Sequence, residues 1–156
     1  MSRQMDTSVE IRLAKVEDAL AIAHVHVASW RSTYPSIVPQ HYIDSLQVQD
    51  FAERWQYRLL TQPEMVIYVA AFGGTICGFA SCGPARVQLS GFSGEIYAIY
   101  LSKESHSKRI GSRLFWTAAT HLERTGHSSM YLWVLKDNPA CGFYERMGGT
   151  LPLPPR

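Results

Sequence analysis

Cysteine is scarce in this sequence, and its spacing excludes two classes of small protein. The 156 residues include three cysteines, Cys77, Cys82 and Cys141. An odd number does not make a disulfide framework, and none of the spacings matches a pair of metal ligands. We therefore expect the reduced thiols of a cytoplasmic protein, each a small buried hydrophobe rather than a nucleophile.

Long apolar runs and a large net charge are missing as well. The first seven residues form a polar tail without a secretory signal, and no run approaches the roughly 18 apolar residues of a membrane helix. The formal net charge is +2, whereas a nucleic-acid binder would carry a concentrated basic face. Basic residues gather only locally, at Lys103, Lys108, Arg109 and Arg113. This predicts a small anionic ligand, and neither a nucleic acid nor a membrane as partner.

A metal-binding pattern and a dinucleotide-binding loop are absent too. None of the six histidines has ligand spacing. His24 and His26 lie two residues apart on a predicted helix, so they point to different sides and do not chelate together. The junction at residues 14–18, after the first predicted strand, has no glycine-rich loop. We therefore expect no bound metal and no dinucleotide-binding fold.

What is present is a series of strands and helices that fits one α/β domain over residues 1–156. The order β-α-α-β-β-β-α-β-α favours a mixed, largely antiparallel sheet flanked by helices. Residues 86–93 are polar and read as a loop, and Pro39 opens a short segment. Hydrophobic periodicity and turn residues predict strands at 9–14, 65–72, 75–82, 95–101 and 129–135, and helices at 17–32, 48–62, 110–125 and from Pro139.

The stretch from Gly94 to Gly149 is the most informative. An apolar strand leads through a basic turn into a helix that opens at Ile110. The first amide groups of a helix have no partners within it and lie at the positive end of its dipole, so they can hold a pyrophosphate. Gly111 allows a ligand to approach the backbone closely, and Lys108 adds positive charge. The fifth predicted strand, apolar on both faces, is expected to lie inside the sheet.

This stretch resembles the GNAT superfamily of N-acetyltransferases, and the similarity extends over nearly the whole chain. Its most specific part is the motif Asn138-x-Ala140-x-x-Phe143-Tyr144-Glu145-x-x-Gly148. The segment Trp30-x-x-x-Tyr34-Pro35 resembles one branch of small bacterial members. The resemblance implies the GNAT fold and acetyl-coenzyme A as co-substrate, without a metal. It also implies direct transfer of acetyl to a primary amine of a small molecule or amino acid in a ternary complex.

The resemblance also assigns residues to the cofactor. In the family, the pantetheine arm bonds the backbone of the fourth strand like an extra strand, a role that falls here on Ile99 and Leu101. Asn138 would contact the arm and also cap the last helix. The full cofactor-binding set predicted in this way is Ile99, Tyr100, Leu101, His106, Ser107, Lys108, Arg109, Ile110, Gly111, Ser112, Asn138 and Tyr144.

The phosphate-binding turn departs from the family pattern at two of its three signature positions. His106 stands where glutamine or arginine is usual, and Arg109 stands where the first glycine is usual. If the backbone at Arg109 is left-handed, it carries strain that glycine would avoid. Otherwise its amide is aimed differently, and the guanidinium could grip a phosphate instead.

Direct attack by an amine needs no enzyme nucleophile, so the predicted catalytic residues are few. Tyr144 is the candidate acid that protonates the departing sulfur, and its alternative role is a core aromatic. Glu95 is the candidate base, directly or through water, although a carboxylate at a strand end is often only solvated. Trp30, Tyr34 and Tyr97 are candidates for the acceptor pocket. For Trp30, an ordinary core position is the alternative.

The C-terminal tail, residues 150–156, is rich in proline. Members of the family normally continue with two more strands beside the fifth, but Pro152, Pro154 and Pro155 do not donate ladder hydrogen bonds. We therefore expect a sheet that lacks the usual last strands, with an exposed edge on the fifth strand. Such an edge favours pairing with a second chain, which predicts a homodimer.

Two other functions remain open at the level of sequence. The altered phosphate turn and the missing strands also suit a non-catalytic acyl-coenzyme A-binding or interaction module, which would bind the cofactor without releasing its thiol. A third possibility is a remnant of the fold that no longer binds the cofactor. The sequence does not identify the amine acceptor, because acceptor pockets are assembled from loops of weak pattern.

Overall fold

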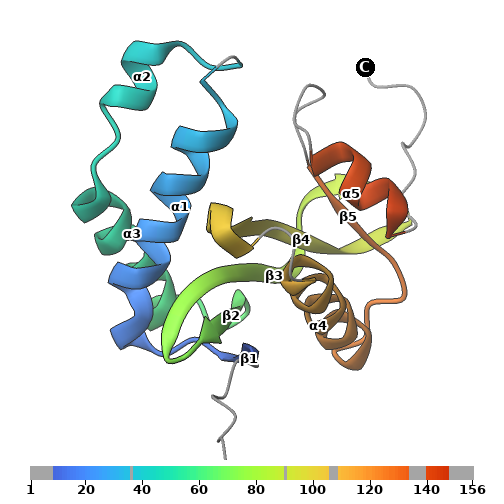
Figure 1. Cartoon of the computed structure of the whole chain (residues 1–156). Coiled ribbons are helices and arrows are strands. Elements are labelled where there is room, and N and C mark those ends of the chain that lie inside the picture. Colours follow the sequence, from blue (N-terminus) through green and yellow to red (C-terminus); the bar gives the residue numbers. More distant parts are fainter. Residues whose placement is uncertain (1–8, 36, 90, 106–108, 134–139, 148–156) are drawn as a thin grey trace, which may run out of the picture.

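A five-stranded sheet with helices on both faces forms the body of the protein (Figure 1). The computed structural model describes residues 9–35, 37–89, 91–105, 109–133 and 140–147. The strands are β1 (Val9–Leu13), β2 (Val66–Phe72), β3 (Thr75–Leu89), β4 (Phe92–Leu101) and β5 (Met130–Leu132). The α-helices are α1 (Ala19–Thr33), α2 (Gln40–Asp44), α3 (Val48–Thr61), α4 (Ile110–Arg124) and α5 (Ala140–Arg146), and two short 3-10 helices cover Val16–Asp18 and Lys103–Ser105.

The sheet is mixed, as the sequence predicts. Its strand order is β1-β2-β3-β4-β5. The first four strands are antiparallel to their neighbours, and β5 lies parallel to β4. Among the described strands β5 is the last of the sheet, so the inner position predicted for it is not observed. Residues 134–135 of that predicted strand and the tail at 150–156 lie outside the described residues.

Each face of the sheet has its own core. On one face, α4 buries the predicted stripe of Ile110, Leu114, Ala118 and Leu122 against β2, β3 and β4, each side chain at most 2% exposed. On the other face, α1 and α3 pack their apolar side chains against Phe79 and neighbouring residues of the sheet. Figure 1 shows α1 and α3 on one side of the strands and α4 on the other. No helix within the described ranges is long and apolar enough to cross a bilayer.

The predicted loop at residues 86–93 is wrong. β3 runs on to Leu89 and β4 begins at Phe92, so the two strands form a long hairpin whose turn contains Gly91 at φ 83°. The polar composition of this segment suggested a loop. It forms strands instead because contacts with residues distant in sequence hold it in place. The hydroxyl of Tyr131 on β5 lies 2.9 Å from the carbonyl oxygen of Val87, and it accepts from the Val87 N–H at 3.1 Å.

A β-bulge interrupts the pairing of β3 with β4 at Tyr97. Ser81 faces Ala98 and the next residue, Cys82, faces Ile96, so Tyr97 is an extra residue on β4. Bulges of this kind bend a strand and re-aim its side chains, and they are common beside active sites. Gly83 makes room for this bulge, because a Cβ atom there would lie 2.6 Å from the Tyr97 hydroxyl oxygen.

Candidate active site

Strand β4 is paired along one side and only in part along the other. β3 follows it as far as Leu101, whereas β5 pairs only with Gly94–Ile96. The Ser102 N–H donates to the Cys77 carbonyl of β3 at 2.8 Å. Because peptide groups alternate along a strand, those of Ile99 and Leu101 point away from β3. They face the side that no described strand occupies beyond Ile96.

Helix α1 reaches the same edge of β4. The hydroxyl of Ser29, a residue only 6% exposed, donates to the carbonyl oxygen of Leu101 at 3.0 Å. A carbonyl oxygen has a second lone pair, so Leu101 keeps the capacity to accept another hydrogen bond. The edge is thereby fixed in position against α1.

The first amide groups of α4 have no hydrogen-bond partner within the helix. The Arg113 N–H is bonded to the carbonyl oxygen of Arg109 at 3.2 Å, so the amides of Ile110, Gly111 and Ser112 precede the first helical hydrogen bond. The first turn contains no acidic residue that would repel an anion. The Ile110 side chain is 1% exposed within the α4 core. Ile110 therefore offers a ligand its backbone alone.

Gly111 connects three elements at this point. A Cβ atom on Gly111 would lie 3.3 Å from the side chain of Leu101 on β4 and 3.5 Å from the ring of Phe143 on α5. The end of β4, the start of α4 and the face of α5 therefore meet around one small residue. Of the predicted cofactor residues, Leu101 and Gly111 are brought together here, beside Phe143 of α5.

Arg109, the N-cap of α4, has the left-handed conformation that the family pattern raised as a question. Its φ and ψ are 60° and 14°, and among the described residues no other non-glycine residue has a positive φ. We expect Arg109→Gly to raise the free energy of unfolding by about 1 kcal/mol, since glycine adopts this conformation without a steric penalty. Urea unfolding of the two proteins measures the difference.

Alanine at the same position is the matched control for Arg109→Gly. Arg109→Ala removes the guanidinium but keeps a Cβ atom in the left-handed conformation, so it should give no such gain. A loss of cofactor affinity common to both variants would come from the guanidinium. An alanine variant as stable as the glycine variant would contradict the assignment of strain to this residue.

The basic residues of this region have different surroundings. The Arg113 guanidinium donates to the Val9 carbonyl oxygen at 2.8 Å, which joins α4 to β1. Lys103 is exposed in the 3-10 helix after β4, and Arg109 is exposed as well. The remaining predicted cofactor residues of the turn and the last helix start, namely His106, Ser107, Lys108 and Asn138, lie outside the described residues.

Glu95 lies at the junction of β4 and β5, where it is held by several donors. Its side chain is 1% exposed. The Arg86 guanidinium donates to both carboxylate oxygens, at 2.7 Å to Oε2 and 3.2 Å to Oε1, and the Arg86 N–H donates to Oε1 at 2.9 Å. The Tyr131 hydroxyl is a further donor, 3.1 Å from Oε1. Glu95 is therefore a buried carboxylate in a tight polar cluster and not a solvated strand end.

The charge of Glu95 is stabilised by this cluster. Burial alone would raise the pKa of Glu95, but the hydrogen bonds and positive charge of Arg86 hold that pKa below its ordinary value. Arg86 also lies over the ring of Tyr97, 4.3 Å from its centroid. Burial raises the pKa of Tyr97 to about 12, and its hydroxyl donates to the Pro84 carbonyl oxygen at 2.5 Å. Glu95, Arg86 and Tyr97 thus surround the bulge.

The predicted acceptor residues separate into two places along β4. Trp30 and Tyr34 pack together, with ring centroids 4.5 Å apart, and the Trp30 Nε1–H donates to the Tyr100 hydroxyl at 3.3 Å. Tyr34 is buried. Trp30 and Tyr34 lie beside Tyr100. Tyr97 lies apart from them, at the bulge and under the guanidinium of Arg86. Tyr100, predicted among the cofactor residues, shares the α1 side with this pair.

Tyr144 lies on α5 and is half-buried. Its ring centroid is 5.1 Å from that of Phe143 and 6.4 Å from that of Phe115 on α4. The aromatic packing fixes the ring on the side of α4. Its role as an acid remains a prediction.

Neither a reactive cysteine nor a metal cluster is found in the described part of the chain. Cys77 and Cys82 are buried thiols, as predicted, and burial raises the pKa of Cys82 to about 12. His24 is exposed while His26 is turned inward. No group of three or more His, Cys, Asp or Glu in the described ranges could hold a metal ion. The Cys141 side chain is not described.

A comparison with known protein families shows to which family the chain belongs. The acetyltransferase (GNAT) family matches residues 25–149. The chain belongs to the GNAT family. It is therefore an acyl-coenzyme A-dependent N-acetyltransferase, with the five-stranded sheet and flanking helices of that fold.

Individual GNAT relatives agree with this assignment. The chain is 42% identical to the uncharacterized N-acetyltransferase YuaI of Bacillus subtilis over 137 residues, which cover 88% of this chain and 78% of the relative. It is 25% identical to the spermidine N(1)-acetyltransferase of Thermoplasma acidophilum over 90% of this chain and 88% of the relative. The crystal structure of the PaiA N-acetyltransferase from Thermoplasma acidophilum in complex with coenzyme A shares the fold, with a TM-score of 0.76 at 23% identity over 91% of this chain and 89% of that one.

Two residues that surround Glu95 were missed from the sequence. Arg86 was placed in a loop, and Tyr131 was read only as part of an apolar strand. No short-range pattern links them to Glu95, because the register of three strands brings them together. His26 was considered only as a metal ligand, although its ring stacks on Tyr100 with centroids 4.8 Å apart.

Proposed function

We propose that this GNAT enzyme acetylates the primary amine of a small molecule or amino acid, by direct attack of the amine in a ternary complex. The observation that carries the proposal is the meeting of the β4 edge, the start of α4 and α5 around Gly111. A linear cofactor with a pyrophosphate at one end and a thioester at the other fits such a junction. Acetyl-coenzyme A would supply the activated acetyl group there.

The described residues divide the binding of the cofactor between them. The amides of Gly111 and Ser112 at the start of α4 would donate to the pyrophosphate. The peptide groups of Ile99 and Leu101 would bind the arm along the free side of β4. These residues fit the cofactor because the α4 start has no acidic side chain and the β4 edge faces no described strand beyond Ile96.

Tyr144 and Glu95 are the two candidates for the proton transfers, and they differ in how well they suit that role. Tyr144 donates its hydroxyl proton to the departing sulfur. Glu95, ionised because its pKa is lowered, is the candidate base through water, but its oxygens already accept from Arg86 and Tyr131. A lowered pKa also weakens a base. We therefore expect Glu95 to act mainly by holding Arg86 and the bulge, while a neutral amine attacks the thioester and its surplus proton passes to water.

The acceptor would lie on the face of the sheet that carries α1 and α3. Trp30 and Tyr34 beside Tyr100, and Tyr97 at the bulge, would line its pocket. A homodimer that covers the β5 edge, and a cytoplasmic location, remain predictions.

Calorimetric titration with acetyl-coenzyme A, followed by thiol release across a panel of amines, tests the proposal. We expect micromolar binding and thiol release with at least one primary amine. Binding of the cofactor without release for any amine of the panel would contradict a small-amine acceptor. A lack of binding would contradict the assignment of the cofactor to the β4–α4 junction.

A further inference from the structure

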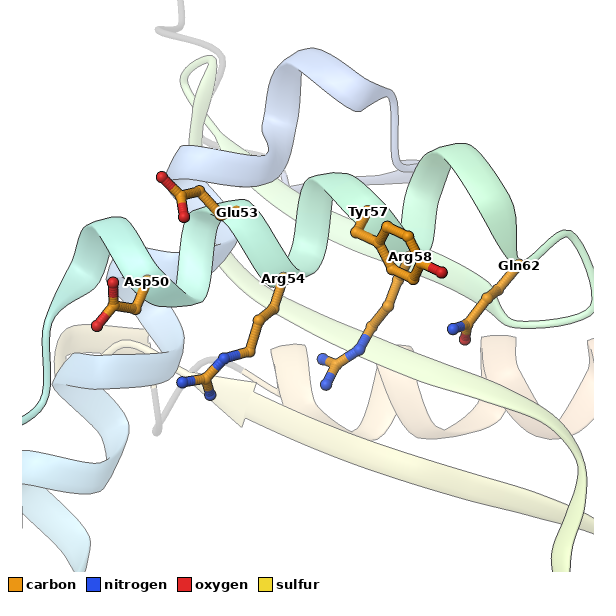
Figure 2. A pocket seen from close by; sticks show the side chains of 6 residues that line it. All are labelled: Asp50, Glu53, Arg54, Tyr57, Arg58 and Gln62. Atoms are coloured by element: carbon orange, nitrogen blue, oxygen red, sulfur yellow. The ribbon is translucent and has the colours of Figure 1, made fainter.

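Helix α3 carries an open groove along an exposed side of the helix, next to the side on which Trp55 is buried. The groove has a volume of about 540 Å³ and is lined by Asp50, Glu53, Arg54, Tyr57, Arg58 and Gln62. Figure 2 shows the side chains of Arg54 and Arg58 extending in the same direction from α3. Arg54 and Arg58 are four residues, about one helical turn, apart on α3, a spacing at which two side chains can contact one ligand.

Neither of these two arginines is neutralised within the described residues. The ion pairs there join Arg12 to Asp18 and Arg86 to Glu95. Arg54 and Arg58 instead lie over aromatic rings of their own helix, 4.8 Å from the centroid of Phe51 and 4.7 Å from that of Trp55. A stacked guanidinium keeps its N–H groups in the plane of the group, where they are able to donate to a carboxylate or phosphate.

Positive charge accumulates around the half-buried Arg58. Burial, and then the charges of Arg54 and Arg86, hold the pKa of Arg58 below its ordinary value. Burial, and then the charges of Arg58 and Arg54, lower the pKa of His26 to about 4, so His26 is neutral near pH 7. Positive charge from three arginines, Arg54 and Arg58 of α3 and Arg86 of β3, is thus concentrated around Arg58. An anion would reduce this mutual repulsion.

A continuous series of contacts links the groove to β4. The Nε1–H of Trp55, beside Arg58, donates to Nδ1 of His26 at 3.0 Å. The ring of His26 stacks on Tyr100, whose neighbours Ile99 and Leu101 form the free edge of β4. Arg58 is therefore linked, through the side chains of Trp55 and His26, to the face of the sheet on which the acceptor is expected.

We propose that the amine acceptor carries an anionic group, a carboxylate or a phosphate, which Arg54 and Arg58 bind while the amine lies beside β4. This inference rests on the proposed small-amine acetyltransferase function. Asp50 and Glu53 line the other end of the groove and repel an anion there, so the anionic group lies at the arginines. A polycation such as spermidine would be repelled by Arg54 and Arg58 at that end.

Matched pairs of acceptors test the proposal. An L-amino acid is compared with its primary amide, and an aminoalkyl phosphate with its parent amino alcohol, while spermidine serves as a polycationic acceptor. We expect kcat/KM to be about 10- to 150-fold higher for the anionic member of at least one pair, the range that a hydrogen-bonded charge contributes. The pair that shows the difference in kcat/KM indicates whether the anionic group of the acceptor is a carboxylate or a phosphate. Equal values within both pairs, or a preference for spermidine, would overturn the proposal.

Variants then assign the preference to the groove. In Arg54→Gln/Arg58→Gln we expect kcat/KM for the anionic acceptor to fall to that of its neutral partner, with the neutral value nearly unchanged. Arg58→Lys should retain part of the preference because it keeps the charge. Arg124→Gln, an exposed arginine on α4 at the opposite face, is the control and should change neither value. An equal loss for both members of a pair would indicate a structural effect and contradict the proposal.

Inorganic phosphate provides a test that does not depend on turnover. Calorimetric titration of phosphate into coenzyme A-saturated protein should show saturable binding that Arg54→Gln/Arg58→Gln abolishes. If no amine is acetylated but this difference is found, the proposed function fails and the anion site stands. If neutral amines are acetylated and the two proteins bind phosphate equally or not at all, the function stands and the anion site fails.

Discussion

Replacing Arg86 with methionine is expected to lower the free energy of unfolding by about 3 kcal/mol at neutral pH. The substitution removes the charged partner of a carboxylate that is 1% exposed, and an unpaired buried charge costs about 3–5 kcal/mol. We expect the lower end of this range. The Arg86 N–H and the Tyr131 hydroxyl still donate to Glu95, and the Arg86 side chain is itself 55% exposed.

The pH dependence of this difference has a definite sign. The pKa of Glu95 is lowered in the folded wild type, so its contribution to stability is present above the unfolded pKa of about 4.3 and is lost as the pH falls through the folded value. In Arg86→Met, burial without the guanidinium would raise the pKa of Glu95. Protonation of Glu95 as the pH falls would then remove the unpaired buried charge and restore part of the lost stability. The gap between the two free energies of unfolding should therefore begin to narrow above the unfolded pKa, and it should continue to narrow as the pH falls through the lowered pKa of the wild type.

Urea unfolding at pH 7, 5 and 3.5 measures this gap. The double variant Arg86→Met/Glu95→Gln removes both charges and should recover much of the lost stability at pH 7. Arg124→Met, at an exposed arginine of α4, is the control and should stay close to the wild type at every pH. A gap that does not change between pH 7 and pH 3.5 would show that Arg86 stabilises the hairpin by packing alone.

The substitution Tyr144→Phe should reduce kcat by about 10²- to 10⁴-fold, the range that a positioned general acid contributes. The ring of Tyr144 is packed against Phe143 and Phe115, and phenylalanine preserves these contacts. Affinity for acetyl-coenzyme A should therefore change little. Calorimetry gives the affinity, and thiol release with the best acceptor gives the rate.

A second tyrosine provides the matched control for this loss of a hydroxyl. Tyr68 on β2 contacts His121 of α4, with its hydroxyl 3.3 Å from Nδ1, and lies on the α4 face of the sheet. Tyr68→Phe should leave kcat within about threefold of the wild type, since this hydroxyl is outside the proposed site. A kcat for Tyr144→Phe as high as that of Tyr68→Phe would exclude Tyr144 as the acid. The proton would then reach the sulfur from water.

The sequence predicted what depends on local pattern. The strand Glu95–Leu101, the helix after it and the buried stripe from Ile110 to Leu122 all follow from periodicity, and the structure confirms them. The left-handed Arg109 was foreseen as one of two alternatives because glycine is usual at that place in the family. In each case the information lies within a few residues of the feature.

What could not be predicted depends on register between distant segments. Arg86 and Glu95 pair because β3 continues past its expected end, and Tyr131 joins them only because β5 lies parallel to β4. The arginines of α3 have the same origin: on the sequence they are two polar positions of an amphipathic helix. Only the stacking of Arg58 over Trp55, which donates to His26 of α1, links them to the core on that face of the sheet.

The placement of β1 at the outer side of β2 has a consequence for the order in which the chain can fold. Leu13 pairs with Tyr68 across a loop that contains α1, α2 and α3, whereas β2, β3 and β4 are joined by two short turns. Closing the long loop costs more conformational entropy, and hairpins of neighbouring strands close quickly. The three-stranded meander can therefore form first and serve as the surface on which β1 and the first three helices dock. The acceptor side of this enzyme would then be the last part of the molecule to take shape.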